Sequence, residues 1–239
     1  MLTMYDIFNS DTINIFTDGS IYKNLNTGET IGSTGALIMH GSDFNTAYLD
    51  NRTGILRNTT NNETEIESVL LGLKLASDYI RRTNIPYHVN LFSDSKICIV
   101  GLREWMFNWI KCTYSGVLYN SSGSPVMNQE TFKSCVSVIL ESNMNVSLYH
   151  QKGHVANSDA SIQNAIKVFK ELNGDSVDST FIKTVSYFNN SVDIFTKNDL
   201  KNRINNKEFD TLAKDVVAPF ILDPAGMDMN KYKYLISKK

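Results

Sequence analysis

Three acidic residues occupy positions from which they could act together. Asp18 follows the alternating apolar and polar residues 13–17, and Asp94 follows a similar run, 87–93. Glu65 lies between them in the sequence, in the second turn of a segment with helical spacing. Neighbouring parallel strands bring the residues at their carboxyl ends together, and the helix that connects them can add a side chain. Carboxylates grouped in this way repel one another unless protons or cations neutralise them, and oxygen ligands suit Mg²⁺.

Each of these acids also has an ordinary structural interpretation. An Asp followed by Gly, as at Asp18-Gly19, is a common turn former. Thr60 and Glu63 have the spacing of a helix capping box, so Glu63 is interpreted as a capping residue. The order strand, helix, strand favours a shared site over separate roles. In such a site, two cations about 3.5–4 Å apart would assist phosphodiester hydrolysis.

The spacing of apolar residues predicts the elements that would position these acids. Five strands are expected, at 13–17, 33–40, 46–56, 87–93 and 145–149. The first three are expected as an antiparallel meander, and the helix before the fourth implies a right-handed crossover with a parallel pairing. Helices are expected at 61–82, at 95–111 as one or two short helices, at 128–142, at 160–172 and from about 191. Residues 114–125, rich in Gly, Ser and Asn, predict a loop.

The composition is that of an ordinary globular protein, with 239 residues, of which 42% are hydrophobic and 20% charged. No apolar run is long enough to span a bilayer, and no secretory signal is recognised, so a cytoplasmic protein is expected. The three cysteines match no zinc or redox spacing. A net charge of −2 disfavours a protein that holds nucleic acid by bulk charge alone, but it is compatible with a local groove and metal ions.

Several segments resemble the motifs of the type 1 ribonuclease H family. They are Phe16-Thr-Asp-Gly-Ser20, Thr60-Asn-Asn-Glu-Thr-Glu65, Phe92-Ser-Asp-Ser95, Lys152-Gly-His154 and the segment Gly101–Trp109 with its two tryptophans. The resemblance covers roughly residues 12–155 in order and resumes near 189. It implies an α/β ribonuclease H-like fold, with a mixed five-stranded sheet flanked by helices. It also implies an endonuclease that cuts the RNA strand of RNA–DNA hybrids.

The resemblance further implies which residues do the chemistry. Asp18, Glu65, Asp94 and Asp193 would hold two Mg²⁺ ions, for which Mn²⁺ is a possible substitute. Asp193 is favoured because Asn189-Asn-Ser-Val-Asp193 fits the family's Asn-x-x-x-Asp helix start, and Asp159 is its rival because it lies nearer to His154 in sequence. His154 would assist proton transfer or product release, with Gly153 making its loop mobile.

Contacts with the RNA–DNA hybrid are implied as well. They involve Gly19, Ser20 and Asn61 on the RNA strand, and Thr60, Trp105, Trp109 and Asn128 on the DNA strand. Thr60 could be only a helix cap, and the tryptophans could belong to the core. Many relatives have a basic protrusion at 111–125, where this chain has only Lys111, so weaker or differently achieved hybrid binding is expected. The basic, aromatic tail 231–239 could supply contacts, but an ordinary solvated tail is favoured.

We therefore predict a ribonuclease H domain at 1–204 with an insertion at about 156–188, followed by a C-terminal extension at 205–239. A monomer that removes RNA primers or hybrids during replication is expected. One competing hypothesis is another nuclease on the same fold, such as a junction resolvase or an integrase-like enzyme, which the Thr-Asn-Asn-x-x-Glu motif and the paired tryptophans disfavour. Another is a non-enzymatic hybrid-binding domain, which the retention of all the candidate acids disfavours.

Overall fold

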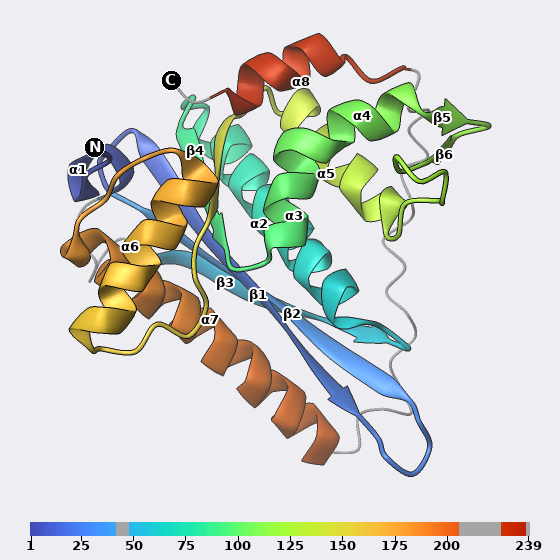
Figure 1. Ribbon diagram of the computed structural model, residues 1–239, viewed down its shortest axis with the longest axis horizontal. Helices are drawn as coiled ribbons and strands as arrows, with labels where there is room; N and C mark the ends of the chain where they lie inside the picture. The colour runs from blue at the N-terminus through green and yellow to red at the C-terminus, as the bar shows by residue number, and fades with distance from the viewer. Residues whose placement is uncertain (42–47, 206–225, 238–239) are drawn as a thin grey trace.

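The protein is built on a five-stranded mixed sheet with helices on both faces. The computed structural model describes residues 1–41, 48–205 and 226–237. The strand order is β3-β2-β1-β4-β7 (Figure 1). The strands are β1 (Thr12–Lys23), β2 (Thr30–His40), β3 (Tyr48–Arg57), β4 (His88–Ser93) and β7 (Asn145–His150). The first three pair antiparallel, while β4 pairs parallel to β1 and to β7, which confirms the predicted meander and crossover.

The first strand is longer than its alternating pattern predicted. Ile13 and Ile15 are fully buried on one face of the sheet and Phe16 on the other. Strand β1 then continues to Lys23 because β2 pairs with it along its whole length, whereas its parallel pairing with β4 ends at Thr17. The first two residues of the predicted third strand, 46–47, lie outside the described residues.

One face of the sheet is covered by helix α2 (Asn61–Thr83), whose apolar stripe packs on β1 and β2. At the start of this helix, only one of the two hydrogen bonds of the predicted capping box is present. Thr60 Oγ1 accepts a hydrogen bond from the backbone N–H of Glu63, while the Glu63 carboxylate accepts one from Thr59 instead of from the Thr60 backbone. The helix ends at Asn84, which has a left-handed backbone conformation and donates its N–H to the Ile80 carbonyl.

Further helices extend this layer. They are α3 (Lys96–Val100), the π-helical turn η1 (Gly101–Trp105), α4 (Met106–Lys111), α5 (Gln129–Glu141) and α8 (Met229–Ile236). The predicted short helices at 95–111 are thus one nearly continuous helical stretch. The predicted loop at 114–125 includes most of a small hairpin, β5 (Thr113–Tyr114) and β6 (Val117–Leu118).

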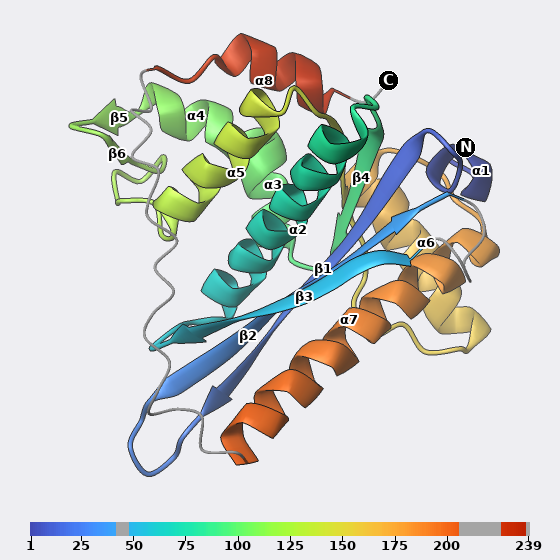
Figure 2. The same ribbon diagram turned by 180° about the vertical axis from the view of Figure 1, so that it is seen from behind.

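The opposite face is covered by α1 (Met4–Ile7), α6 (Asp159–Asn173) and α7 (Ser179–Asn205), as Figures 1 and 2 show from both sides. The prediction that the last helix begins near Ser191 was wrong. Helix α7 begins twelve residues earlier because Phe181, Ile182 and Val185 already bury their side chains against α6 and the sheet. Asp193 therefore lies in the middle of a helix and not in its first turn.

The C-terminal helix α8 is part of the core. Tyr232, Leu235 and Ile236 are buried, and the hydroxyl of Tyr232 donates to the Leu102 carbonyl at 2.9 Å. The interpretation of 231–239 as a solvated tail was therefore wrong for its described part, because apolar side chains face inward at helical spacing. The lysines at 238–239 lie outside the described residues. No helix in the described part of the chain is both long and apolar enough to cross a membrane.

Candidate active site

A cavity of about 630 Å³ opens beside the point where β1 and β4 cease to pair. Its lining includes all the preferred acidic candidates and the candidate histidine: Asp18, Glu65, Asp94, Asp193 and His154. Asp18 and Asp94 come directly after the last parallel pair, Thr17 and Ser93, so the strand register itself places them as neighbours.

A close contact between β1 and α2 brings Glu65 to the same place. Gly19 follows Asp18, and a Cβ atom at Gly19 would lie 2.8 Å from the backbone nitrogen of Glu65. Only the absence of a side chain lets the strand approach the first turns of the helix so closely. Asn61 then donates its amide to Glu65 Oε1 at 2.7 Å, which fixes the direction of the carboxylate.

Asp94 is enclosed by two segments distant in sequence. Gly153 packs so tightly that a Cβ atom there would lie 2.3 Å from Asp94 Oδ2. The absence of a side chain at Gly153 therefore permits this close packing, while the mobility of its loop stays a prediction. From α7, the amide of Asn189 lies 3.5 Å from the same oxygen and donates to it, while its own Oδ1 is buried without a partner among the described residues.

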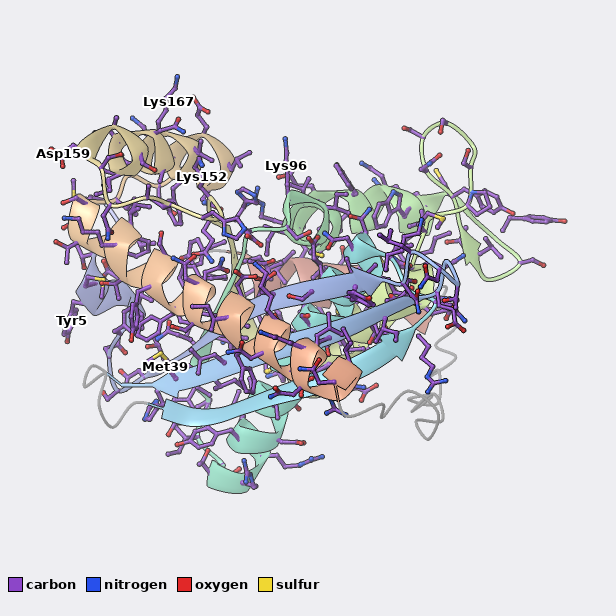
Figure 3. The ribbon with its side chains drawn as sticks, turned by 90° about the horizontal axis from the view of Figure 1, so that it is seen from below. Tyr5, Met39, Lys96, Lys152, Asp159 and Lys167 are labelled. Atoms are coloured by element: carbon purple, nitrogen blue, oxygen red, sulfur yellow. The ribbon has the colours of Figure 1, made fainter. Side chains whose placement is uncertain are left out.

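The structure separates the two candidates for a fourth acid. Asp193 lines the cavity with a side chain that is 13% exposed, whereas Asp159 is exposed at the start of α6 and outside the lining. Figure 3 shows Asp159 at the outer edge of the molecule. Lys197, one turn further along α7, places its ammonium 2.7 Å from both carboxylate oxygens of Asp193.

The buried carboxylates favour a positive partner. Burial, together with the charges of Asp94, Asp193 and Glu65, raises the pKa of Asp18 to about 8. Burial also raises the pKa values of Glu65 and Asp94, although Asn189 and His154 partly offset the effect on Asp94. Buried acids with raised pKa values are suited to bind divalent cations in place of protons, and the donors are all oxygen.

These residues fit a divalent cation by donor type and by charge. Within the residues that the structure describes, no three His, Cys, Asp or Glu side chains are already drawn together as a ligand cluster. Unneutralised carboxylates repel one another, so this spacing is consistent with side chains that close on a cation only when it binds.

Known proteins share this sequence pattern. The chain matches the RNase H family over residues 10–169, a region that includes Asp18, Glu65, Asp94 and His154 and ends before Asp193. The chain belongs to the RNase H family. This places it among the ribonucleases H, hydrolases that degrade RNA in RNA–DNA hybrids.

Curated relatives agree with this placement. Ribonuclease H of a Thermoanaerobacter species is 31% identical over 150 residues, covering 62% of this chain and 83% of that protein. Ribonuclease HI of Haemophilus influenzae is 32% identical over 118 residues, covering 49% of this chain and 64% of that protein.

Solved structures similar to this chain include LC9-RNase H1, a type 1 RNase H with the type 2 active-site motif. It is 20% identical, with a TM-score of 0.45 over 70% of this chain and 74% of that one. LC11-RNase H1 in complex with RNA/DNA hybrid is 16% identical, with a TM-score of 0.40 over 71% of this chain and 99% of that one.

The predicted RNA-strand contacts of this RNase H differ in accessibility. Gly19, Ser20 and Asn61 all line the cavity. Ser20, however, is 6% exposed, and its hydroxyl is 2.8 Å from that of Thr196 on α7. A side-chain contact from Ser20 would require this internal hydrogen bond to open. The Gly19 N–H donates to Asp18 Oδ1 at 2.8 Å, and Asn61 is exposed, with its amide donating to Glu65.

The predicted DNA-strand contacts lie away from the cavity. Trp109 is 9% exposed and packs edge-on against Phe132, which favours the core role for this residue. Trp105 is 38% exposed and is available at the surface. Thr60 is exposed but caps α2, and Asn128 has a left-handed backbone just before α5, with no side-chain capping bond.

Sequence reasoning did not assign two supporting residues. Ser68, one turn after Glu65, is fully buried, and its single hydroxyl proton is shared between the Asp18 carbonyl at 2.7 Å and the Thr64 carbonyl at 2.6 Å. The ion pair of Lys197 with Asp193 was not expected either. Spacing of three or four residues from a candidate ligand on a helix is the signal that could have found both.

Proposed function

We propose that this RNase H cuts the RNA strand of an RNA–DNA hybrid with two divalent cations, Mg²⁺ or in its place Mn²⁺, held by Asp18, Glu65, Asp94 and Asp193. The observation that supports it most is the shared cavity of these acids, with Asp18 buried and its pKa raised to about 8. When bound, the cations supply positive charge that activates a water and stabilises the leaving oxygen. All of these acids come from one chain, so a monomer is sufficient.

In this proposal, the water oxygen bonds to phosphorus and the bond from phosphorus to the 3′-oxygen breaks. The products carry a 5′-phosphate and a 3′-hydroxyl, and the leaving 3′-oxygen takes up a proton. His154 is exposed on the wall of the cavity, where it can deliver that proton or assist product release. Asn61 and the backbone of Gly19 would face the RNA strand, whose 2′-hydroxyl distinguishes it from DNA.

The chain's other residues hold these groups in place. Ser68 supports the backbone at Asp18, Asn61 orients Glu65, and Asn189 donates to Asp94. Such activity would serve the removal of RNA primers and other hybrids during replication. Trp105, Thr60 and Asn128 are the remaining candidates for contact with the DNA strand, because Trp109 is largely committed to the core.

An end-labelled RNA–DNA hybrid tests the proposal, with matched RNA and DNA duplexes and a four-way DNA junction as controls. We expect cleavage of only the hybrid's RNA strand, lost in chelator and in Asp94→Asn. Asp193→Asn should abolish cleavage, while Asp159→Asn, which removes the same charge outside the cavity, should not. If the protein binds the hybrid but does not cut it with Mg²⁺ or Mn²⁺, the proposed hydrolysis is contradicted. A non-enzymatic hybrid-binding domain would then be the better interpretation.

A further inference from the structure

Helix α6 lies between His154 and Asn189 in the sequence. Its C-terminal end lies beside the turn that carries Asp94. Strand β7 is an edge strand of the sheet, so the residues along its open side lack a neighbouring strand. Asn173, the last residue of α6, is 8% exposed and lies against this edge at His150.

The carboxamide of Asn173 makes the two hydrogen bonds that a neighbouring strand would otherwise make at this position. Its Oδ1 accepts from the His150 N–H at 2.9 Å, and its Nδ2 donates to the His150 carbonyl at 2.7 Å. Both backbone groups of His150 on the open edge are therefore satisfied by one side chain. Because His150 is paired with Ser93 across the sheet, this fixes the residue beside the start of the Asp94 turn.

The ring of His150 continues the connection to Asp94. Its Nε2 lies 3.1 Å from the Asp94 carbonyl oxygen, which can only accept, so Nε2 carries the proton. Its Nδ1 is buried with no hydrogen-bond partner among the described residues. An apolar side chain at this position would leave the Asp94 carbonyl without this donor, so the hydrogen bond accounts for a buried imidazole here.

A second contact joins η1 to the same end of α6. Arg103 on η1 donates to the Leu172 carbonyl at 2.7 Å and to Asn173 Oδ1 at 3.3 Å. A cation at the C-terminal end of α6 is favoured by the helix dipole. The helical stretch that follows Asp94 is thus tied to the same end of α6 as the strand beside it.

We propose that Asn173 is a positioning residue that holds the Asp94 turn through His150, so that the helix α6 braces the cation site. The inference rests on the proposed function in one respect only, namely that Asp94 holds a cation. It assigns to the segment 156–188 a role in the geometry of the site, in place of a merely peripheral one.

The test uses the full-length protein and measures Ca²⁺ affinity by calorimetry without substrate, together with kcat and KM on a hybrid. Asn173→Ala should weaken Ca²⁺ binding and lower kcat by roughly three- to tenfold, with little change in KM. Asn14→Ala is the matched control, because Asn14 is a fully buried, hydrogen-bonded amide on β1 away from this edge. Both variants are measured well below their melting temperatures. Equal effects of Asn173→Ala and Asn14→Ala on Ca²⁺ affinity and kcat would overturn the proposal.

His150→Phe separates positioning from stability. It removes the donor to Asp94 but also removes the unpartnered Nδ1, so the fold should be retained while Ca²⁺ affinity and kcat fall. Unchanged affinity and kcat in this variant would refute the brace. Hydrogen exchange gives a readout independent of catalysis: protection of the His150 amide should be lost in Asn173→Ala. If this protection is lost but wild-type protein neither binds Ca²⁺ nor cuts hybrid, the proposed function fails and the brace remains as structure.

Discussion

Gly153 is packed against the carboxylate of Asp94 so closely that a Cβ atom in its place would lie 2.3 Å from Oδ2 and 3.3 Å from Cβ of that aspartate. A Cβ atom essentially never comes this near to another heavy atom, so either the Asp94 side chain or the backbone at Gly153 would have to move. The segment that carries His154 therefore restricts the position of the Asp94 carboxylate.

Gly153→Ala should lower hybrid cleavage by at least about tenfold, because the added methyl group displaces a side chain that must hold a cation. The change is measured as kcat, with circular dichroism to verify that the fold is retained. Gly226→Ala is the control, because a Cβ atom at Gly226 would meet nothing within 4 Å. Full activity in Gly153→Ala would show that Asp94 tolerates displacement or is not needed.

The raised pKa of Asp18 predicts how stability depends on pH when no divalent cation is present. An acid whose folded pKa, about 8, lies above its unfolded value of about 3.9 binds more protons in the folded state between these values. Its contribution to the free energy of unfolding is therefore full below about pH 4 and is lost as the pH rises towards 8.

In chelator, the melting temperature of wild-type protein should fall more steeply from pH 5 to 8 than that of Asp18→Asn. At pH 8 the variant should be more stable by at least about 1.4 kcal/mol, the equivalent of one pKa unit. Asp159→Asn, which removes an exposed acid, should keep the wild-type slope. Parallel slopes for wild type and Asp18→Asn would mean that burial and the neighbouring acids do not raise the pKa of Asp18.

Much of the sheet could be predicted because its apolar pattern and crossover leave few alternatives. The three acids at 18, 65 and 94 are set by strand register and by one helix, and these are local features of the sequence. The start of α7 could not be predicted, because it depends on Phe181 and Val185 finding partners on α6. Tertiary burial, and not a capping signal, decides where that helix begins.

The same limit applies to the partners of the acids. Asn173 and Asp94 are far apart in sequence, and nothing in the spacing of either residue predicts that both meet His150. The burial of α8 was missed for a similar reason, since alternating lysines and tyrosines at 231–234 are typical both of a solvated tail and of an amphipathic helix. Which of the two forms depends on whether the core offers a surface for Tyr232.

Lys197 should oppose cation binding at Asp193, because its ammonium already lies 2.7 Å from both oxygens of that carboxylate. Lys197→Met removes this competitor and should tighten binding of the weaker of two Mn²⁺ ions by roughly two- to fivefold, as expected for a partly exposed ion pair. Mn²⁺ binding is measured by electron paramagnetic resonance in the absence of substrate.

Lys201→Met provides the matched control for Lys197→Met, since Lys201 lines the same cavity and the change in net charge is identical. Lys197→Arg keeps the positive charge and should leave Mn²⁺ affinity near that of wild type. A similar gain in affinity for both methionine variants would assign the effect to net charge instead of to the pair with Asp193.

The C-terminal helix should contribute to stability through one buried tyrosine. Tyr232 is fully buried, and Tyr232→Phe removes only its hydrogen bond to the Leu102 carbonyl, which should cost about 0.5–1.5 kcal/mol of the free energy of unfolding. Tyr232→Ala also leaves a cavity against Phe107 and should cost about 3–5 kcal/mol. Urea unfolding measures both values.

Tyr234, on the same helix, is 62% exposed, so Tyr234→Phe should lower the urea midpoint less than Tyr232→Phe does. Tyr232→Phe should also retain full cleavage activity well below its melting temperature, because α8 packs on α5 and β7 and contributes nothing to the lining of the acidic cavity. A loss of activity without a loss of stability in Tyr232→Phe would instead connect α8 to the site through Leu102 and the helical stretch that follows Asp94.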